Sequence, residues 1–356
     1  MWVKTIAAQH LRSFNEFNLQ LGTGLNIFTG PNGAGKTSIL EALDILSRGK
    51  SFRSSSMSPV IQFDQKSLII HASVMNGEDQ AFHAGVQYSS GQTLIKLNQE
   101  KIDKWSQLAA ELPIIDIHPE SYLLITGAPE NRRKFLAWGA FHVEPSFYSA
   151  WQKYHRALKQ RNECLKQNNY KDAANWHPVM VESATLITKI FQHYTEAITP
   201  YIIDLIDYFG FEELVEVDFD AGWDRAQSFQ KALEAELLER NHTTTIGPHR
   251  CDLKLHWQGK KFAKSSSRGQ QKVLAVAMKL AQASLLQENI NKTPIYLIDE
   301  LVAELDEVRC AAALEVIAAL NAQALITSVT PEPINQFNNH SAKWFHVEHG
   351  QATEMV

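Results

Sequence analysis

A glycine-rich run near the start of the chain carries the residue types that bind a phosphate chain. Residues 30–37 read GPNGAGKT, and the glycines allow backbone N–H groups to converge on an anion at a helix N-terminus. Lys36 then places a cation on the β and γ phosphates, and the Thr37 hydroxyl can ligate Mg²⁺. This P-loop predicts an ATP site made of Gly30, Pro31, Asn32, Gly33, Ala34, Gly35, Lys36, Thr37 and Ser38.

A second acidic element stands far along the chain, where residues 294–300 read PIYLIDE. Four apolar residues predict a buried strand whose end presents two carboxylates. Asp299 would hold Mg²⁺ through water, and Glu300 would polarise the attacking water as the general base. The alternative is an acidic turn after an ordinary core strand.

These residues need a parallel sheet to bring them together. Apolar residues 24–29 predict a strand that leads into the P-loop, and the spacing of apolar residues after Lys36 predicts a helix. Later segments alternate in the same way: a helix at 270–286, a strand at 293–298, a helix at 308–320 and a strand at 322–327. This alternation predicts the α/β class, with a parallel sheet flanked by helices.

The 356 residues are enough for two domains. Short apolar runs between 60 and 117 predict further strands, whereas residues 130–240 read as helical. Prolines interrupt every candidate heptad there, which argues against a long coiled coil. We therefore expect an ATPase domain formed by 1–120 with 243–356, and a compact, mostly helical inserted lobe at 121–242.

A third element, S-x-G-Q, is formed by Ser267, Gly269 and Gln270 at a predicted helix start. By itself it is an anion site or an ordinary helix cap. The order of P-loop, S-x-G-Q and acidic strand end is that of ABC-type ATPases, in which the S-x-G-Q of one subunit caps the γ-phosphate held by the other. The sequence thus predicts a dimer that forms on ATP.

Between these motifs, the chain resembles the RecF family of bacterial recombination mediators over nearly its whole length. The similar segments are GKSFR at 49–53, PE at 119–120, GxPxxRRxFL at 127–136, WGxFHxEP at 138–145 and GPHRxDL at 247–253. The resemblance implies an ATP-dependent homodimer that clamps double-stranded DNA and gap junctions without sequence specificity. It also implies that the protein acts with RecR and RecO to load RecA in DNA replication, gap repair and SOS induction. Slow ATP hydrolysis would serve as a switch.

By position, the resemblance assigns Glu300 and Lys36 to catalysis, Thr37 and Asp299 to Mg²⁺, and Arg12 to ATP, as in the related SMC proteins. Glu300 stands where the family more often has Asp. Where many ABC ATPases have a switch histidine, this chain has Thr327 and Ser328. The glutamine loop has no assignable residue, and residues 118–120 are the candidate place for it.

Candidate DNA contacts come from local basic blocks, because the net charge of −5 gives no overall positive field. Residues 253–287 hold seven basic residues and no acid: Lys254, Lys260, Lys261, Lys264, Arg268, Lys272 and Lys279. DNA contact is predicted for Lys260, Lys261 and Lys264. A second block on the helical lobe comprises Lys153, Arg156, Lys159 and Arg161, and solvated surface is the alternative for both blocks. Arg132 and Arg133 fit either a third patch or internal salt bridges.

Composition and cysteine usage predict a cytoplasmic protein. Cys164, Cys251 and Cys310 are odd in number and far apart, which argues against a disulfide framework or a zinc site. No apolar run approaches the roughly 18 residues of a membrane span. Two alternatives to the DNA-binding ATPase are a transporter ATPase subunit, disfavoured by the long stretch between Thr37 and Ser267, and a scaffold that binds ATP without hydrolysing it.

Overall fold

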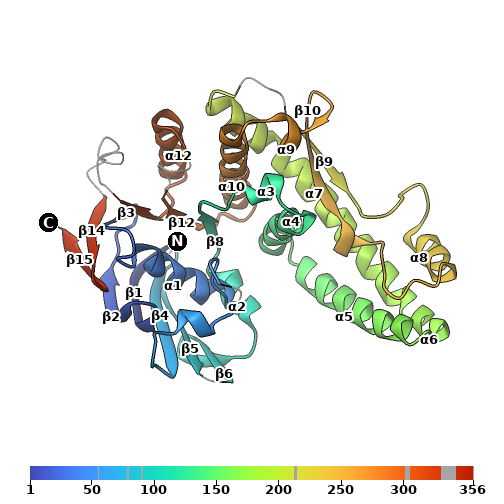
Figure 1. The fold of residues 1–356 in the computed structure, drawn as a ribbon, viewed down its shortest axis with the longest axis horizontal. Coiled ribbons are helices and arrows are strands. Elements are labelled where there is room, and N and C mark those ends of the chain that lie inside the picture. Colours follow the sequence, from blue (N-terminus) through green and yellow to red (C-terminus); the bar gives the residue numbers. More distant parts are fainter. Residues whose placement is uncertain are drawn as a thin grey trace. The chain divides into compact units, whose positions relative to one another are not determined.

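The computed structural model describes residues 1–54, 56–77, 80–89, 91–211, 215–300, 305–329 and 342–355 (Figure 1). The chain divides into two compact units, one formed by Met1–Ser121 with Val276–Val356 and the other by Tyr122–Ala275. Residues 243–275, which the sequence assigned to the ATPase domain, pack within the second unit. The reason is that β10 (Asp252–Trp257) pairs with β9 (Val215–Asp220) of the expected lobe.

The first unit contains the expected parallel sheet, with strand order β15-β14-β3-β13-β12-β8. Its strands are β3 (Leu25–Thr29), β8 (Ile114–Ile117), β12 (Ile295–Asp299), β13 (Ala324–Ser328), β14 (Lys343–Glu348) and β15 (Gln351–Met355). All neighbours pair in parallel except β14 and β15. The central strands are runs of buried residues, as parallel strands covered on both faces require. The α/β prediction is confirmed.

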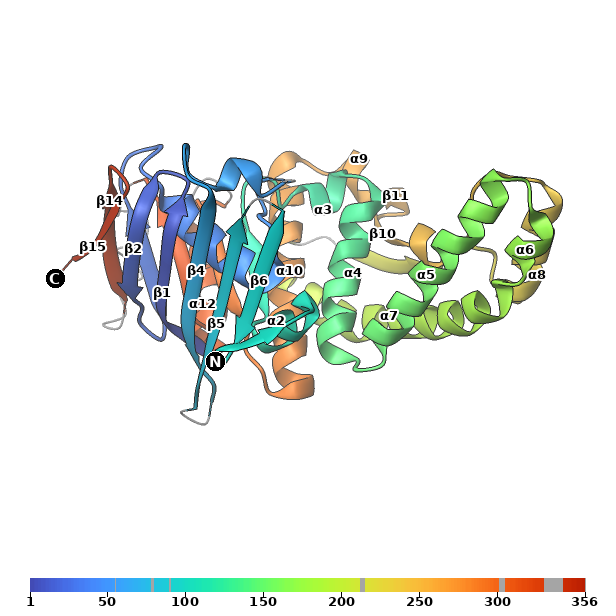
Figure 2. The ribbon, with the colours of Figure 1, turned by 90° about the horizontal axis from the view of Figure 1, so that it is seen from below.

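A second sheet of the same unit is wholly antiparallel, with order β2-β1-β4-β5-β6-β7. Its strands are β1 (Trp2–Leu11), β2 (Phe14–Gln20), β4 (Ser67–Met75), β5 (Ala81–Ser89), β6 (Gln92–Leu97) and β7 (Glu100–Ile102). Figure 2 shows β2, β1, β4, β5 and β6 side by side in blue to cyan. The sequence predicted strands in these segments without their order.

Helix α1 (Lys36–Arg48) packs against strands of both sheets. Its apolar side chains Ile39, Leu40, Leu43 and Leu46 are fully buried, and so are the carboxylates Glu41 and Asp44. A helix buried on every side needs partners for its polar groups. The other helices of this unit are α2 (Trp105–Glu111), α12 (Glu307–Ala319), the short η1 (Ser58–Val60) and most of α10 (Arg268–Ile290).

The second unit is mostly helical. Its further elements are α3 (Leu123–Thr126), α4 (Pro129–Val143), α5 (Phe147–Lys166), α6 (Tyr170–Ala174), α7 (His177–Tyr208), α8 (Phe229–Leu238), η2 (Pro248–Arg250), β11 (Lys260–Lys261) and α9 (Phe262–Ser265). The stretch expected to be helical contains strand β9, where apolar and acidic residues alternate with the period of a strand. α5 packs on α7, which contains Pro200. The prediction of a compact lobe without a long coiled coil is confirmed for the residues that the structure describes. Among the helices that the structure describes, none is long and apolar enough to cross a membrane.

Candidate functional site

The P-loop follows β3 and ends in the first turn of α1. Gly30 has a φ of 147°, and a Cβ atom there would lie 2.1 Å from the backbone oxygen of Val347. Gly35 has a φ of 110° and is the N-cap residue of α1, where a Cβ atom would lie 2.6 Å from the ring of Phe14. Glycine is required at both positions. Because glycine has no side chain to cap the helix, the N–H groups of the first turn can bind an anion.

The Lys36 side chain is folded back onto the P-loop. Its Nζ donates to the backbone oxygens of Gly30, at 2.7 Å, and Pro31, at 3.0 Å. Burial lowers the pKa of Lys36, while Glu300 and Asp299 act in the opposite direction. The ammonium group therefore lies beside the loop and is bonded to carbonyl oxygens. When ATP binds, phosphate oxygens can take the place of these carbonyl oxygens.

Thr37 and Asp299, the two predicted Mg²⁺ residues, are in direct contact. The Thr37 hydroxyl donates to Oδ1 of Asp299 at 2.8 Å, joining the start of α1 to the last residue of β12. A hydroxyl that donates its hydrogen keeps its lone pairs, so Thr37 can bind a cation while it stays bonded to Asp299. Hydroxyl and carboxylate oxygens are ligands that Mg²⁺ prefers, and the donor set fits that ion.

Glu300 directly follows β12 in the left-handed backbone conformation, with a φ of 55°. This conformation costs a residue other than glycine about 1–3 kcal/mol and is concentrated at functional sites. The carboxylate of Glu300 raises the pKa of Lys36, so it acts electrostatically on the P-loop cation. The role of Glu300 as general base stays a prediction.

Thr327 stands where the sequence lacks a switch histidine. It lies on β13 directly beside Asp299 in the register of β12 and β13, and it is buried. Its hydroxyl donates to Oδ1 of Asp299 at 2.7 Å and accepts the backbone N–H of Glu300 at 3.0 Å. The sequence marked Thr327 only as a departure, and the structure brings it into the site.

The resemblance assigns Arg12 to ATP. In the structure, its guanidinium donates hydrogen bonds to α1 and to residues 54–59. Nε and Nη2 donate to the two carboxylate oxygens of Glu41, at 2.9 and 2.6 Å. Nη1 donates to the backbone oxygen of Pro59 and Nη2 to the hydroxyl of Ser54. These bonds leave one N–H of Nη1 for a phosphate. The turn that carries Arg12 packs against Gly35 of the P-loop, and the ATP contact stays a prediction.

The S-x-G-Q residues open α10 as a capping box. The Ser267 N–H donates to Oε1 of Gln270 at 2.7 Å, and the Gln270 N–H donates to the Ser267 hydroxyl at 3.3 Å. Within one chain, this geometry is the ordinary helix cap considered above. The O–H of Ser267 is not used by these bonds, so it can donate to a phosphate. The contact of Ser267, Gly269 and Gln270 with ATP of a second copy stays a prediction.

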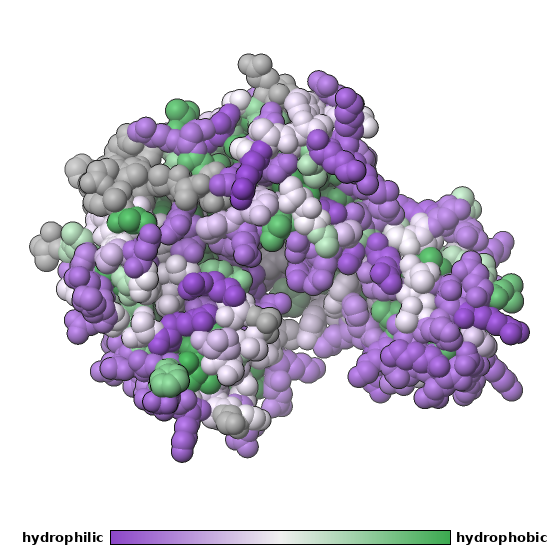
Figure 3. Space-filling model, in the orientation of Figure 1, coloured by the Kyte–Doolittle hydropathy of each residue, from purple (hydrophilic) through white to green (hydrophobic). Residues whose placement is uncertain are grey.

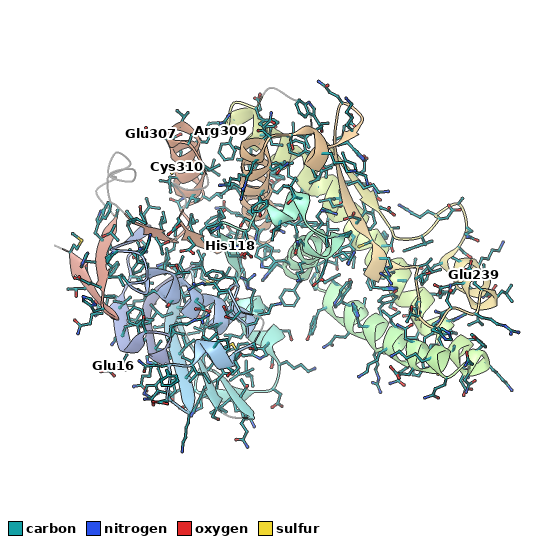
Figure 4. The ribbon with its side chains drawn as sticks, viewed as in Figure 1. Glu16, His118, Glu239, Glu307, Arg309 and Cys310 are labelled. Atoms are coloured by element: carbon teal, nitrogen blue, oxygen red, sulfur yellow. The ribbon has the colours of Figure 1, made fainter. Side chains whose placement is uncertain are left out.

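A buried charged cluster surrounds the segment considered for the glutamine loop. Asp116, on β8, accepts from Arg48 at 3.1 Å and lies 3.4 Å from Nζ of Lys279 and 3.1 Å from Nε2 of His118, which Figure 4 labels. Burial alone would raise the pKa of Asp116, but Lys279 and Arg48 hold it well below its ordinary value. Burial raises the pKa of Asp44, which pairs with Arg48, to about 6. The cluster ties α1 to β8 and α10.

The first basic block does not form one continuous face. Lys254 pairs with Asp220 at 2.6 Å, and Lys279 points to Asp116. The three residues singled out for DNA are exposed on β11 and α9, and none takes part in a salt bridge within the described residues: Lys260, Lys261 and Lys264. These three lysines can therefore contact a phosphate, and Arg268 of the same block is exposed too.

The second basic block, on α5, also contains both exposed and internally paired residues. Lys153, Arg156 and Lys159 are exposed, and Figure 3 shows hydrophilic residues gathered over the end of the second unit that α5 and α6 form. Arg161, in contrast, is fully buried and pairs with Glu236 at 3.0 Å. Its place in a DNA-contact block was therefore wrong, because the guanidinium is inside the lobe.

Arg161→Met is expected to lower the free energy of unfolding by about 3–5 kcal/mol, because it leaves Glu236 buried without its cation. Urea unfolding followed by circular dichroism measures the change. Arg156→Met is the matched control on the exposed face of α5, where a change within about 0.5 kcal/mol is expected. Equal losses in the two variants would contradict a structural role of Arg161.

Arg132 and Arg133 are internal partners. Arg132 binds both carboxylate oxygens of Asp252, at 2.7 and 3.1 Å, and Arg133 donates to the backbone oxygen of Cys251 at 3.0 Å. Arg132 therefore fits the internal salt bridge, one of the two alternatives left open by the sequence, whereas Arg133 bonds to the backbone.

Comparisons with known proteins extend over nearly the whole chain. Residues 2–353 match the family described as RecF/RecN/SMC N terminal domain. The DNA replication and repair protein RecF of Shewanella loihica is 39% identical over 98% of this chain and 99% of that protein. That of Shewanella piezotolerans is 36% identical over 99% of each.

Solved structures share the fold. A structure of the recombination mediator protein RecF with ATPrS, in the RecFOR pathway, has a TM-score of 0.88 at 23% identity, over 100% of this chain and 98% of that chain. The Smc head domain of Pyrococcus furiosus, with an extended coiled coil, has a TM-score of 0.61 at 14% identity, over 99% of this chain and 96% of that chain. The chain therefore shares its fold with RecF and with the Smc head domain.

Proposed function

Because this chain belongs to the RecF family, we propose that it is an ATP-switched, DNA-binding recombination mediator in DNA replication, gap repair and SOS induction. The observation that carries the proposal is the 2.8 Å hydrogen bond between the Thr37 hydroxyl and Asp299. It joins the P-loop to the acidic strand end, as Mg²⁺-dependent ATP binding requires.

Each residue of the site has a distinct role. Lys36 and the N-terminus of α1 bind the phosphates, and Thr37 and Asp299 hold Mg²⁺, which when bound neutralises phosphate charge. Glu300 takes a proton from the attacking water. Hydrolysis is slow and ends the bound state, so the enzyme works as a switch.

The site is completed by a second copy of the chain. Ser267, Gly269 and Gln270 of that copy cap the γ-phosphate, which makes ATP part of the dimer interface. Light scattering after size-exclusion chromatography tests this: with ATP and Mg²⁺, the mass should rise from that of one 40.2 kDa chain to that of two. If the measured mass is the same with and without ATP, whether or not duplex DNA is present, the ATP-dependent dimer is refuted.

DNA is bound through its backbone, without base recognition. Lys260, Lys261 and Lys264 supply one exposed basic group, and Lys153, Arg156 and Lys159 supply another. The outward face of β9 carries Glu216 and Asp218 and repels phosphate. Such binding is driven by the release of counterions and weakens as salt rises.

Lys260→Ala combined with Lys261→Ala is expected to make the salt dependence of DNA affinity shallower by about one unit of log–log slope per lost phosphate contact. Fluorescence anisotropy of labelled duplex DNA across a salt series measures it. Lys254→Ala is the control, because Lys254 is already paired with Asp220, and its slope should equal that of the wild type. An unchanged slope in the double variant removes these lysines from the interface.

The proposed partners are RecR and RecO, with RecA loaded downstream at single-stranded gaps. Relatives that are 36–39% identical carry the name DNA replication and repair protein RecF, which supports this assignment. The three free cysteines, Cys164, Cys251 and Cys310, fit a cytoplasmic protein.

Of the two alternatives, the ATP-binding scaffold is the one with an observation in its favour: Thr327 replaces the switch histidine. The proton acceptor Glu300 stands against it, and phosphate release by the wild type separates the two proposals. A transporter subunit is disfavoured by the full-length match to the RecF/RecN/SMC family.

A further inference from the structure

Thr327 lies where the strands that carry the nucleotide site meet. β13 runs between β3, which leads into the P-loop, and β12, which ends in Asp299. In the register of the sheet, Thr327 is paired with Phe28 on one side and with Asp299 on the other. Its side chain is buried, so the hydroxyl needs partners within the protein.

Both hydrogen-bond partners of that hydroxyl belong to the two acidic residues of the site. Its hydrogen goes to Oδ1 of Asp299 at 2.7 Å, and its oxygen accepts the N–H of Glu300 at 3.0 Å. The Thr37 hydroxyl donates to the same oxygen of Asp299 at 2.8 Å. Oδ2 is thus the oxygen that these bonds leave for a cation or its water, and Oδ1 is held from strand β13 and from helix α1.

We infer that Thr327 is a positioning residue for ATP hydrolysis, which holds the Asp299 carboxylate and the backbone of Glu300 in one fixed relation. This inference rests on the proposed hydrolytic function of the same site. The single hydroxyl couples the two acids, so the residue that holds Mg²⁺ and the residue that activates water keep their spacing as ATP enters.

The left-handed backbone of Glu300 explains why such a residue is needed. Glu300 has a φ of 55°, a conformation that persists only where its surroundings fix it. The N–H of Glu300 is held by Thr327 across the sheet. On the neighbouring strand, Thr29 instead bonds to the backbone oxygen of Phe345 at 3.4 Å. A buried threonine of this sheet can therefore bond to backbone alone, whereas Thr327 bonds to the carboxylate of Asp299 and to the backbone N–H of Glu300.

Thr327→Val keeps the shape of the side chain and removes both hydrogen bonds, and Thr327→Ser restores the hydroxyl. We expect the valine variant to hydrolyse ATP about 10- to 100-fold more slowly in single turnover, because a displacement of about 1 Å costs up to about 100-fold. Its Kd for ATP with Mg²⁺ should change less than about threefold, since Lys36 and the P-loop are untouched. The serine variant should recover most of the rate.

Thr188→Val is the matched control, because the Thr188 hydroxyl is buried in α7 without a partner among the described residues. Its rate should equal that of the wild type. Wild-type rates in Thr327→Val overturn the inference, and so does a serine variant as slow as the valine variant.

Amide hydrogen exchange provides a readout that does not depend on turnover. The N–H of Glu300 should exchange at least about tenfold faster in Thr327→Val than in the wild type, because it loses its acceptor. Equal exchange in the two proteins overturns the inference even if both hydrolyse ATP. A wild type without turnover, together with the faster exchange in the variant, would instead refute the proposed hydrolysis and leave the positioning contact standing.

Discussion

Replacing Glu300 with glutamine is expected to lower the rate of ATP hydrolysis about 10²- to 10⁴-fold, the range for loss of a general base. The amide has almost the shape of the carboxylate but cannot accept the proton of the attacking water. The backbone N–H of Glu300 keeps its acceptor on Thr327, so the strand end should not move. Phosphate release in the presence of duplex DNA measures the effect.

The lifetime of the ATP-bound dimer should increase in this variant while hydrolysis slows. Glu300→Gln keeps Lys36, Thr37 and Asp299, so ATP still binds and the dimer should persist longer on DNA than in the wild type. Glu288→Gln, at an exposed position of α10, is the control for the same chemical change and should leave turnover unchanged. Full turnover in Glu300→Gln would exclude Glu300 as the base, and a wild type without turnover would favour the scaffold.

The parts of the site that local sequence determines were predictable. Four apolar residues before Asp299 could only form a buried strand, and the glycines before Lys36 marked a tight loop at a helix start. Both strands lie in the same parallel sheet, so their carboxyl ends had to share one edge. At this edge Thr37 and Asp299, the two residues predicted to bind Mg²⁺, are in contact.

Contacts between distant segments were not predictable in this way. Glu41 and Asp44 are charged, yet α1 packs against both sheets and buries them. Glu41 pairs with Arg12 from a strand turn, and Asp44 pairs with Arg48, which also binds Asp116 on β8. No spacing in the sequence connects Glu41 with Arg12 or Arg48 with Asp116. The role of Thr327 depends on the strand order, since β13 pairs with β12 and places Thr327 beside Asp299.

Two misreadings had a signal that was present in the sequence. Arg161 follows Tyr154 and Leu158 and precedes Leu165 at helical spacing, which places it on the buried face of α5. In β9, Val215, Val217 and Phe219 alternate with acids, the pattern of a half-buried strand. In both cases the overall composition of the segment obscures its period.

Replacing Lys36 with arginine is expected to abolish the rise in mass with ATP and the ATP-dependent retention of DNA. The ammonium group is small and lies between the backbone oxygens of Gly30 and Pro31. A guanidinium is planar and larger, so it cannot occupy the same place beside the first turn of α1. Lys36→Ala, which removes the charge, should weaken ATP binding about 10- to 100-fold, as expected for the loss of a charged hydrogen bond.

Light scattering after size-exclusion chromatography, with ATP and with or without duplex DNA, reports on both effects. Lys292→Arg is the matched control, because Lys292 is half-exposed; its Nζ donates to the backbone oxygen of Ala110 at 3.3 Å and lies 3.7 Å from Glu111. It should dimerise as the wild type does. A normal ATP-dependent dimer in Lys36→Arg would exclude the P-loop as the switch. Loss of the dimer with DNA affinity intact at low salt would show that ATP controls the closure on DNA while the lysines of β11 and α5 supply the attraction.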